Sequence, residues 1–256
     1  MRHSASIARQ EFRLLRNDPG QAIALAVMPV LLMAIVKGPV GVWLTIETGQ
    51  PSTGAELAVP GQAALASYLA MVNFGIFFYR DFGTGVWDRL RVGSARPVEI
   101  VVGKLAANWV VFYLQFLVAF ALGGALFGLD LSRSPVSMLF VAACSVTAAL
   151  AIGLALLCAL LTSSAYESAC IILAMLFGAL GGAFCPDELL PGWASGIKHL
   201  SPVYWSVRAL RHIYLDDRGF ASVVGPCMVL LGIALGASLI SAALLRPSVP
   251  REFRRR

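Results

Sequence analysis

Long apolar runs without charge are the feature of this sequence that most limits what it can fold into. Residues 134–166 include no charged side chain, and this run is too long for a single untilted membrane crossing. A helix that spans the hydrocarbon core of a bilayer needs about 20 apolar residues. Counted this way, the sequence predicts six spans, at 21–36, 57–79, 105–129, within 134–166, 168–186 and 219–245.

The first of these spans is the weakest, because Pro29 lies inside it and Lys37-Gly38-Pro39 follows it. A small polar cluster, Thr162-Ser163-Ser164, and Glu167 separate the fourth span from the fifth. We interpret that separation as a tight hairpin between two helices. The predicted fold is therefore an all-α integral membrane protein with six transmembrane helices.

The composition excludes the other broad classes of protein. Hydrophobic residues make up 58% of the chain and charged residues 13%, whereas an ordinary soluble domain carries roughly 25% charged residues. A disordered chain is poor in apolar residues and rich in charge. Five cysteines, most of them inside apolar runs, do not suit a disulfide scaffold. The alternating strands of a membrane barrel are not visible, and no secretory signal peptide is apparent.

The basic residues predict the orientation in the membrane. The formal net charge is +6. If both termini are cytoplasmic, the inner segments hold 14 of the 20 lysines and arginines and the outer segments hold 6. Positive charge concentrates on the cytoplasmic side of membrane proteins. We therefore expect a multi-pass protein of the plasma (inner) membrane with both termini inside, and no nucleic-acid partner.

The sequence offers little chemistry for an enzyme or an ion-coupled carrier. Spans two to six have no Asp, Glu, Lys, Arg or His in their cores, whereas such carriers usually need a charged residue there. The motifs HExxH and GxSxG are missing, and the histidines and cysteines have no metal-ligand spacing. Gly103-Lys104 does not complete a phosphate-binding loop, because Val98 and Leu105 occupy two required positions. The chain is expected to hold no cofactor, so energy for uphill transport would come from another subunit.

Residues 4–16 predict an amphipathic helix before the first span. Arg9, Arg13 and Arg16 fall on one side of that helix, and Phe12 lies on the opposite side with other apolar residues. Such a helix suits the inner membrane surface, where arginines meet anionic lipid headgroups. Glu11 interrupts the apolar face, which leaves open a contact with a partner protein.

Residues 80–99 form the most charged segment between spans. Trp87 stands among charged residues, and tryptophan is enriched at protein interfaces. The segment is interpreted as a docking surface for a cytoplasmic partner. The alternative is a solvated loop that follows the positive-inside rule.

The outer segment, residues 186–218, predicts short helices that enter the outer leaflet without crossing it. Ser201 and Pro202 suit the N-cap and first position of a helix. A single apolar stripe follows, and aromatic residues fit an interfacial belt. The alternative is a purely structural lid.

A few polar residues inside the spans are candidates for a transport pathway. Polar side chains in hydrocarbon usually face protein or a cavity, and here they lie among aromatic rings. An uncharged aromatic pathway would suit an amphipathic or apolar substrate, and the alternative is ordinary helix packing. The candidates are Asn73, Phe77, Asn108, Phe112 and Gln115.

Two groups of motifs resemble one known family. Asp81-Phe82-Gly83-Thr84 to Leu90, followed by Pro97 to Gly103-Lys104-Leu105, is similar to the coupling-helix loop of type-2 ABC-transporter permeases. Asp81 and Asp88 stand where that family often has further acidic residues, and Gly93-Ser94 replaces its Ser/Thr-Pro. The outer segment also resembles the family's pattern, at Phe184, Pro186, Glu188, Leu190-Pro191, Trp193, Leu200-Ser201-Pro202, Tyr204 and Leu210-Arg211.

The resemblance implies a single transmembrane permease domain over residues 1–256. It implies a separate ABC ATP-binding subunit, which binds ATP and Mg, and a second permease subunit that is identical or paralogous. Drug, lipid and glycan exporters share these features, including those for multidrug efflux. A membrane-embedded enzyme and an ion-independent facilitator remain as alternatives.

The resemblance also implies roles for particular residues. Coupling to the ATPase would involve Asp81, Gly83, Thr84, Trp87, Asp88, Arg89 and Arg91. The outer segment would cap the exit as a lid that includes Pro186, Glu188, Pro191, Trp193, Pro202 and Tyr204.

Overall fold

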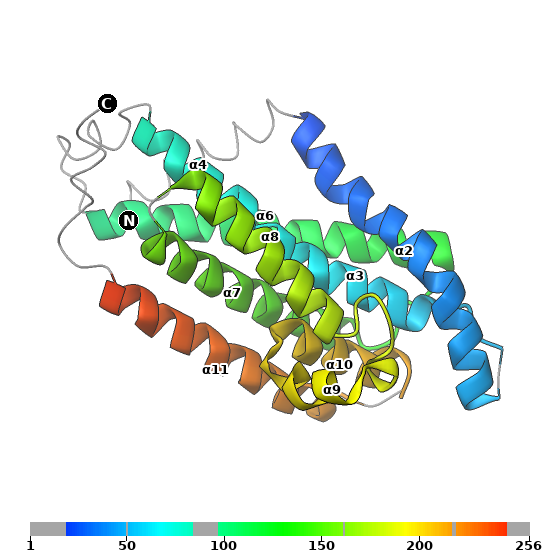
Figure 1. Ribbon diagram of the computed structural model, residues 1–256. Coiled ribbons are helices and arrows are strands. Elements are labelled where there is room, and N and C mark those ends of the chain that lie inside the picture. Colours follow the sequence, from blue (N-terminus) through cyan, green and yellow to red (C-terminus); the bar gives the residue numbers. More distant parts are fainter. Residues whose placement is uncertain (1–18, 50, 84–96, 161, 217–218, 245–256) are drawn as a thin grey trace.

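The computed structural model describes residues 19–49, 51–83, 97–160, 162–216 and 219–244. These residues form a bundle of long helices with shorter helices across one end (Figure 1). The long helices are α2 (Pro19–Thr48), α3 (Ala55–Leu69), α4 (Met71–Gly83), α6 (Pro97–Phe127), α7 (Pro135–Ala159), α8 (Ser163–Leu180) and α11 (Ala221–Leu244). The shorter ones are α9 (Gly192–Ile197) and α10 (Pro202–Tyr214), with 3-10 turns at Asp187–Leu189 and Lys198–Leu200.

Six stretches of the described residues are long and apolar enough to cross a membrane, which confirms the predicted all-α class and number of spans. The short helices before the last span are confirmed as well. The predicted interfacial helix over residues 4–16 lies outside the described residues. The six stretches are Val27–Thr48, Ala55–Ile76, Val101–Phe127, Pro135–Ala159, Ser163–Leu180 and Ala221–Leu244.

Helix α3 is the centre of the bundle. It packs against α2, α6, α7, α8 and α10, and nearly all of its residues are buried. Many of them are alanines, and small side chains allow helices in a membrane to approach closely. On the other side of the bundle, α7 and α11 run along each other (Figure 1).

One stripe of α6 faces the core. Every fourth residue from Lys104 to Phe120 is buried, and this spacing keeps their side chains on one face of a helix. The stripe is polar where α6 begins and aromatic further along. Its members are Lys104, Asn108, Phe112, Phe116 and Phe120.

The first span is longer than the predicted range 21–36. The sequence left open a continuation past Lys37, and α2 continues through Gly38 and Pro39 to Thr48. Proline is tolerated within membrane helices when other groups satisfy the freed backbone. In the last turns of α2, Thr45 and Thr48 donate hydrogen bonds to the carbonyls of Gly41 and Leu44, at 2.8 and 2.7 Å. The helix therefore extends beyond the length that the sequence suggested.

The second span is interrupted, which the sequence did not predict. Helix α3 ends at Leu69, α4 begins at Met71, and Ala70 stands between them. The hydroxyl of Tyr166, which belongs to α8, donates to the Met71 carbonyl at 2.6 Å. A tyrosine hydroxyl thus binds a backbone acceptor beside the interruption.

The predicted hairpin between spans four and five is present. Helix α7 ends at Ala159, and Thr162 caps α8, because its hydroxyl accepts from the Ala165 amide at 3.3 Å. Tyr79 donates to the Leu160 carbonyl at 2.9 Å, so α4 is bonded to this hairpin. Glu167 lies inside α8 and not in the turn.

We predict that Gly75→Ala destabilises the protein by about 1–3 kcal/mol, the usual cost of overpacking. A Cβ at Gly75 would overlap the ring of Tyr166. Gly232→Ala in α11 is the control, because a Cβ there meets nothing within 4 Å. Thermal unfolding of the detergent-purified variants, followed by size-exclusion fluorescence, measures the effect. Equal melting of the two variants would show that the contact of Gly75 with Tyr166 is loose.

Candidate functional site

The end of the bundle where α4 stops and α6 starts holds a buried cation. Lys104 is 2% exposed, and its Nζ lies 5.1 Å from the ring centroid of Phe78 in α4. An ammonium over an aromatic face is attracted by the ring's negative charge density, and desolvation strengthens this attraction. The side-chain amide of Asn108 donates to the Lys104 carbonyl at 2.9 Å. Lys104 therefore joins α6 to α4. These are the two helices that flank the segment predicted to dock the ATPase.

Sequence reasoning did not identify this role of Lys104. It treated the residue as an inner positive charge within the Gly103-Lys104 motif, outside the cores of the spans. Lys104 precedes Asn108 by four residues and Phe112 by eight, and this spacing places the three on one face of a helix. The spacing was the signal in the sequence that Lys104 could be buried with them.

Two of the predicted coupling residues lie at this end of the molecule. Asp81 and Gly83 belong to the last turn of α4. The remaining coupling residues, Thr84, Trp87, Asp88, Arg89 and Arg91, lie outside the described residues, as do Arg9, Phe12, Arg13 and Arg16 of the interfacial helix. Their roles in docking and lipid contact stay predictions.

The predicted pathway residues come from two neighbouring parts of the bundle. Asn73 and Phe77 belong to α4, and the other three belong to α6. Asn108 and Phe112 are buried on the inward stripe of α6. The Oε1 of Gln115 is buried and accepts no hydrogen bond from the described atoms. Lining of a pathway by these residues stays a prediction.

At the opposite end, residues 186–216 form a cap whose main helix is α10. Ser201 is its N-cap and Pro202 its first residue, as the sequence predicted. The Ser201 hydroxyl donates to the Phe177 carbonyl of α8 at 2.8 Å, and the Tyr204 amide donates to that hydroxyl at 3.3 Å. The predicted apolar stripe is buried, at Val203, Val207, Leu210 and Tyr214.

Buried hydrogen bonds fasten this part of the chain to the spans. Gln62 of α3 donates from Nε2 to the Ala183 carbonyl at 2.6 Å, just before the cap. The Ser206 hydroxyl of α10 donates to the Ser145 hydroxyl of α7 at 3.0 Å. Hydrogen bonds shielded from water are stronger and costly to break. The cap is thus a fixed part of the same subunit.

The exposed side of the cap combines aromatic and basic side chains. The guanidinium of Arg208 lies 5.9 Å from the Tyr204 ring and 5.7 Å from the Trp205 ring. Trp193 is 71% exposed on α9, which begins after Pro191. Such residues are typical of the membrane interface. Of the predicted lid residues, Glu188 forms an ion pair with Arg211 at 2.6 Å, while Pro186 is buried.

Two cavities lie beneath the cap. One of about 270 Å³ is lined by Pro186, Tyr204 and Arg208, among others. A second of about 550 Å³ lies between the ends of α2, α6 and α10 and the start of α3. Arg211 and Asp216 line both cavities.

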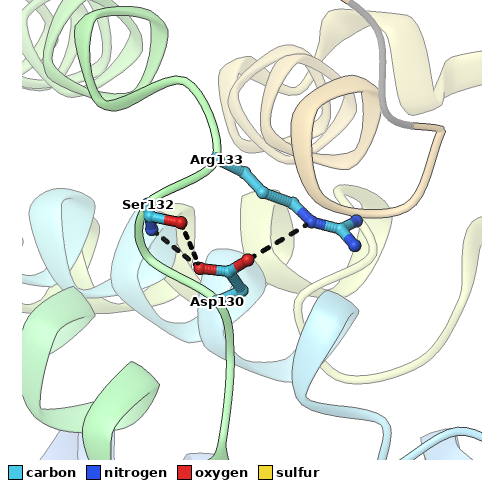
Figure 2. Close-up of polar contacts among 3 residues, drawn as sticks. All are labelled: Asp130, Ser132 and Arg133. Atoms are coloured by element: carbon cyan, nitrogen blue, oxygen red, sulfur yellow. Dashed lines mark hydrogen bonds and ion pairs between the residues drawn. The ribbon is translucent and has the colours of Figure 1, made fainter.

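A short polar turn between α6 and α7 forms part of the larger cavity. Asp130 accepts hydrogen bonds from the hydroxyl and amide of Ser132, at 2.6 and 3.0 Å, and lies 3.7 Å from Nε of Arg133 (Figure 2). The two hydrogen bonds from Ser132, and then the charge of Arg133, hold the pKa of Asp130 below its usual value. The carboxylate is therefore ionised at neutral pH.

The fold defines a multi-pass helical membrane protein with a cap of short helices at one end of the bundle. A scan against family models matches residues 4–215 to the ABC-2 type transporter family. This match covers most of the chain, so the protein belongs to that family.

Curated relatives carry names of the same kind. The chain is 26% identical over 167 residues to ABC transporter G family member 23 of Dictyostelium discoideum, covering 63% of this chain and 23% of the relative. It is 22% identical over 150 residues to the linearmycin resistance permease protein LnrN of Bacillus subtilis (strain 168), covering 59% and 39%. The matches thus span less than half the length of either relative.

We predict that Ser201→Ala loosens α10. The change removes the N-cap and the bond to Phe177, and loss of a cap costs about 1 kcal/mol. Hydrogen exchange of the α10 amides should speed up roughly fivefold, since 1.4 kcal/mol corresponds to tenfold. Ser195→Ala, at an exposed position of α9, should leave α10 unchanged. Unaltered exchange in Ser201→Ala would mean that packing alone holds this helix.

Proposed function

We propose that this chain is the permease subunit of an ATP-driven ABC exporter and that a separate subunit binds and hydrolyses ATP. The observation that carries the proposal is the family match, which runs from residue 4 to residue 215 and includes the charged segment between α4 and α6. A second permease subunit, identical or paralogous, would complete the pathway. The names of the two relatives support this assignment.

Coupling would begin in the segment between α4 and α6 and reach the spans through α4. That helix is held to α6 by Lys104 over Phe78, and to α8 by Tyr166. A displacement of the docking segment would therefore move three helices together. The charged residues from Asp81 to Arg91 would contact the ATPase, and the basic helix before the first span would contact lipid headgroups or the same partner.

The composition of the spans supports an amphipathic or apolar substrate. Asn73, Asn108 and Gln115 supply a few polar groups in helices whose sequences also include Phe77 and Phe112. A drug, a lipid or a lipid-linked glycan has the matching combination of apolar surface and sparse polar groups. One relative's name refers to resistance, which fits removal of a harmful compound.

The docking role predicts a loss of coupling when two charges are reversed. Purified alone, the chain should hydrolyse no ATP. The double variant Asp88→Arg with Arg89→Asp should insert normally but bind the ATPase at least tenfold more weakly, because complementary charges become repulsive. Glu47→Arg is the control, since Glu47 is exposed at the far end of α2. Co-purification and stimulated ATP hydrolysis measure the effect, and normal values in the double variant would contradict the docking role.

The proposed orientation, with both termini in the cytoplasm of a plasma membrane, places Cys185 outside. This thiol is half-buried beside the cap, whereas Cys144 and Cys227 are buried. An impermeant maleimide added to whole cells should label Cys185 and spare those two. A cysteine introduced at Ser248 should be labelled only after lysis. Labelling at position 248 in intact cells would require the inverted topology.

A further inference from the structure

The larger cavity beneath the cap has the features of a binding site that the transport pathway does not include. Its volume is about 550 Å³, within the range of small-molecule sites. Leu44, Leu129 and Leu215 contribute apolar walls. The charged residues that line it are Glu56, Asp130, Arg133, Arg211 and Asp216.

The cavity lies at the end of the bundle where α3 begins and α6 ends. The Lys37 carbonyl faces Gly54, the cap residue of α3, so closely that a Cβ on Gly54 would overlap it. The Lys37 ammonium lies 4.5 Å from the ring centroid of Phe127, the last residue of α6. Lys37 is therefore level with the ends of two neighbouring spans. The rest of α2 rises past those ends, and its Leu44 and Thr48 form one wall of the cavity.

A buried hydroxyl in the wall has no partner within the described residues. Tyr214 is 2% exposed, its ring lies 5.4 Å from that of Phe120, and its hydroxyl makes no hydrogen bond. Leaving such a group buried and unpaired destabilises a protein. Burial, and then the negative charge of Asp130, raise the pKa of Tyr214 to about 12. At neutral pH the hydroxyl keeps its proton and can donate a hydrogen bond to a ligand.

The charges of the wall select the type of ligand. Three carboxylates and two guanidinium groups line the cavity. A simple anion would face the three carboxylates, and a simple cation would face both guanidinium groups. A zwitterion can place its positive group beside the carboxylates and its negative group beside the guanidinium groups. Charge complementarity of this kind gives specificity.

We propose that this cavity binds a zwitterionic head group made of a phosphate diester and an ammonium, as in an ethanolamine phospholipid. Arg133 and the Tyr214 hydroxyl donate to the phosphate oxygens. Glu56, whose Oε2 also accepts from the Ser52 hydroxyl at 3.1 Å, accepts from the ammonium. The apolar walls at Leu44, Leu129 and Leu215 contact the start of the acyl chains.

The test uses the full-length chain purified in detergent and titrated with dihexanoyl phosphatidylethanolamine. Dihexanoyl phosphatidylglycerol, which keeps the phosphate but lacks the ammonium, is the matched lipid. By calorimetry the ethanolamine lipid should bind at least tenfold more tightly than the glycerol lipid. Equal affinity for the two lipids, or no binding of the ethanolamine lipid, overturns the proposal.

The variant Tyr214→Phe distinguishes a binding role from a structural one. It should weaken binding of the ethanolamine lipid roughly fivefold to tenfold, the effect of one hydrogen bond. Without lipid, its melting temperature should be unchanged or higher, because an unpaired buried hydroxyl has been removed. Tyr113→Phe is the control, since the Tyr113 hydroxyl donates to the Leu139 carbonyl outside this cavity. Wild-type affinity in Tyr214→Phe contradicts the assignment.

Such a head group could belong to a resident membrane lipid or to the exported molecule. Proteoliposomes with the ATPase partner and a fluorescent ethanolamine lipid separate these sources. ATP-dependent movement of the lipid between leaflets identifies it as cargo, while binding without movement identifies a resident lipid, and both support the site. This second arm rests on the proposed function, whereas the binding titration does not, so the two can fail separately.

Discussion

The need to bond every backbone group inside the hydrocarbon is the constraint on which this structure depends. Helices meet it along their length, because each amide and carbonyl finds a partner in the same segment. Where a helix is interrupted or ends, a side chain from another element supplies a partner. Tyr166 binds the Met71 carbonyl beside the break in the second span, Tyr79 binds Leu160, and Ser201 binds Phe177. These bonds also determine which helices are joined.

The sequence predicted the features that depend on local pattern. Apolar runs located the six spans, and the dipeptide Ser201-Pro202 located the start of α10. It failed where the outcome depends on contacts between distant residues. The continuation of α2 past Pro39 and the break at Ala70 are decided by neighbouring helices, which a single sequence does not display. The sequence also did not predict the unpaired hydroxyl of Tyr214, because its pattern placed this residue only on an apolar stripe of a helix.

The charged side chains of the described residues are sorted toward the two ends of the bundle. Lys104 lies near the start of α6, whereas Glu188, Arg208 and Arg211 belong to the cap. A buried charge is tolerated only when it is paired or held by other groups. Phe78 and the surrounding helix ends provide such a setting for Lys104. The buried cation thus lies between the two helices that the charged segment connects.

The second span is the element that connects the two ends. Its first half, α3, begins at the cavity with Glu56 and is bonded to Ala183, just before the cap, through Gln62. Its second half, α4, carries Phe78 toward Lys104 and precedes the charged segment that leads to α6. Between the halves stands Ala70, where the helix is interrupted and Tyr166 binds the neighbouring carbonyl. An interrupted helix can change the angle between its halves with fewer broken bonds than a continuous one. The break at Ala70 therefore separates a half that is packed among five other helices from a half that is bonded chiefly to α8 and its hairpin.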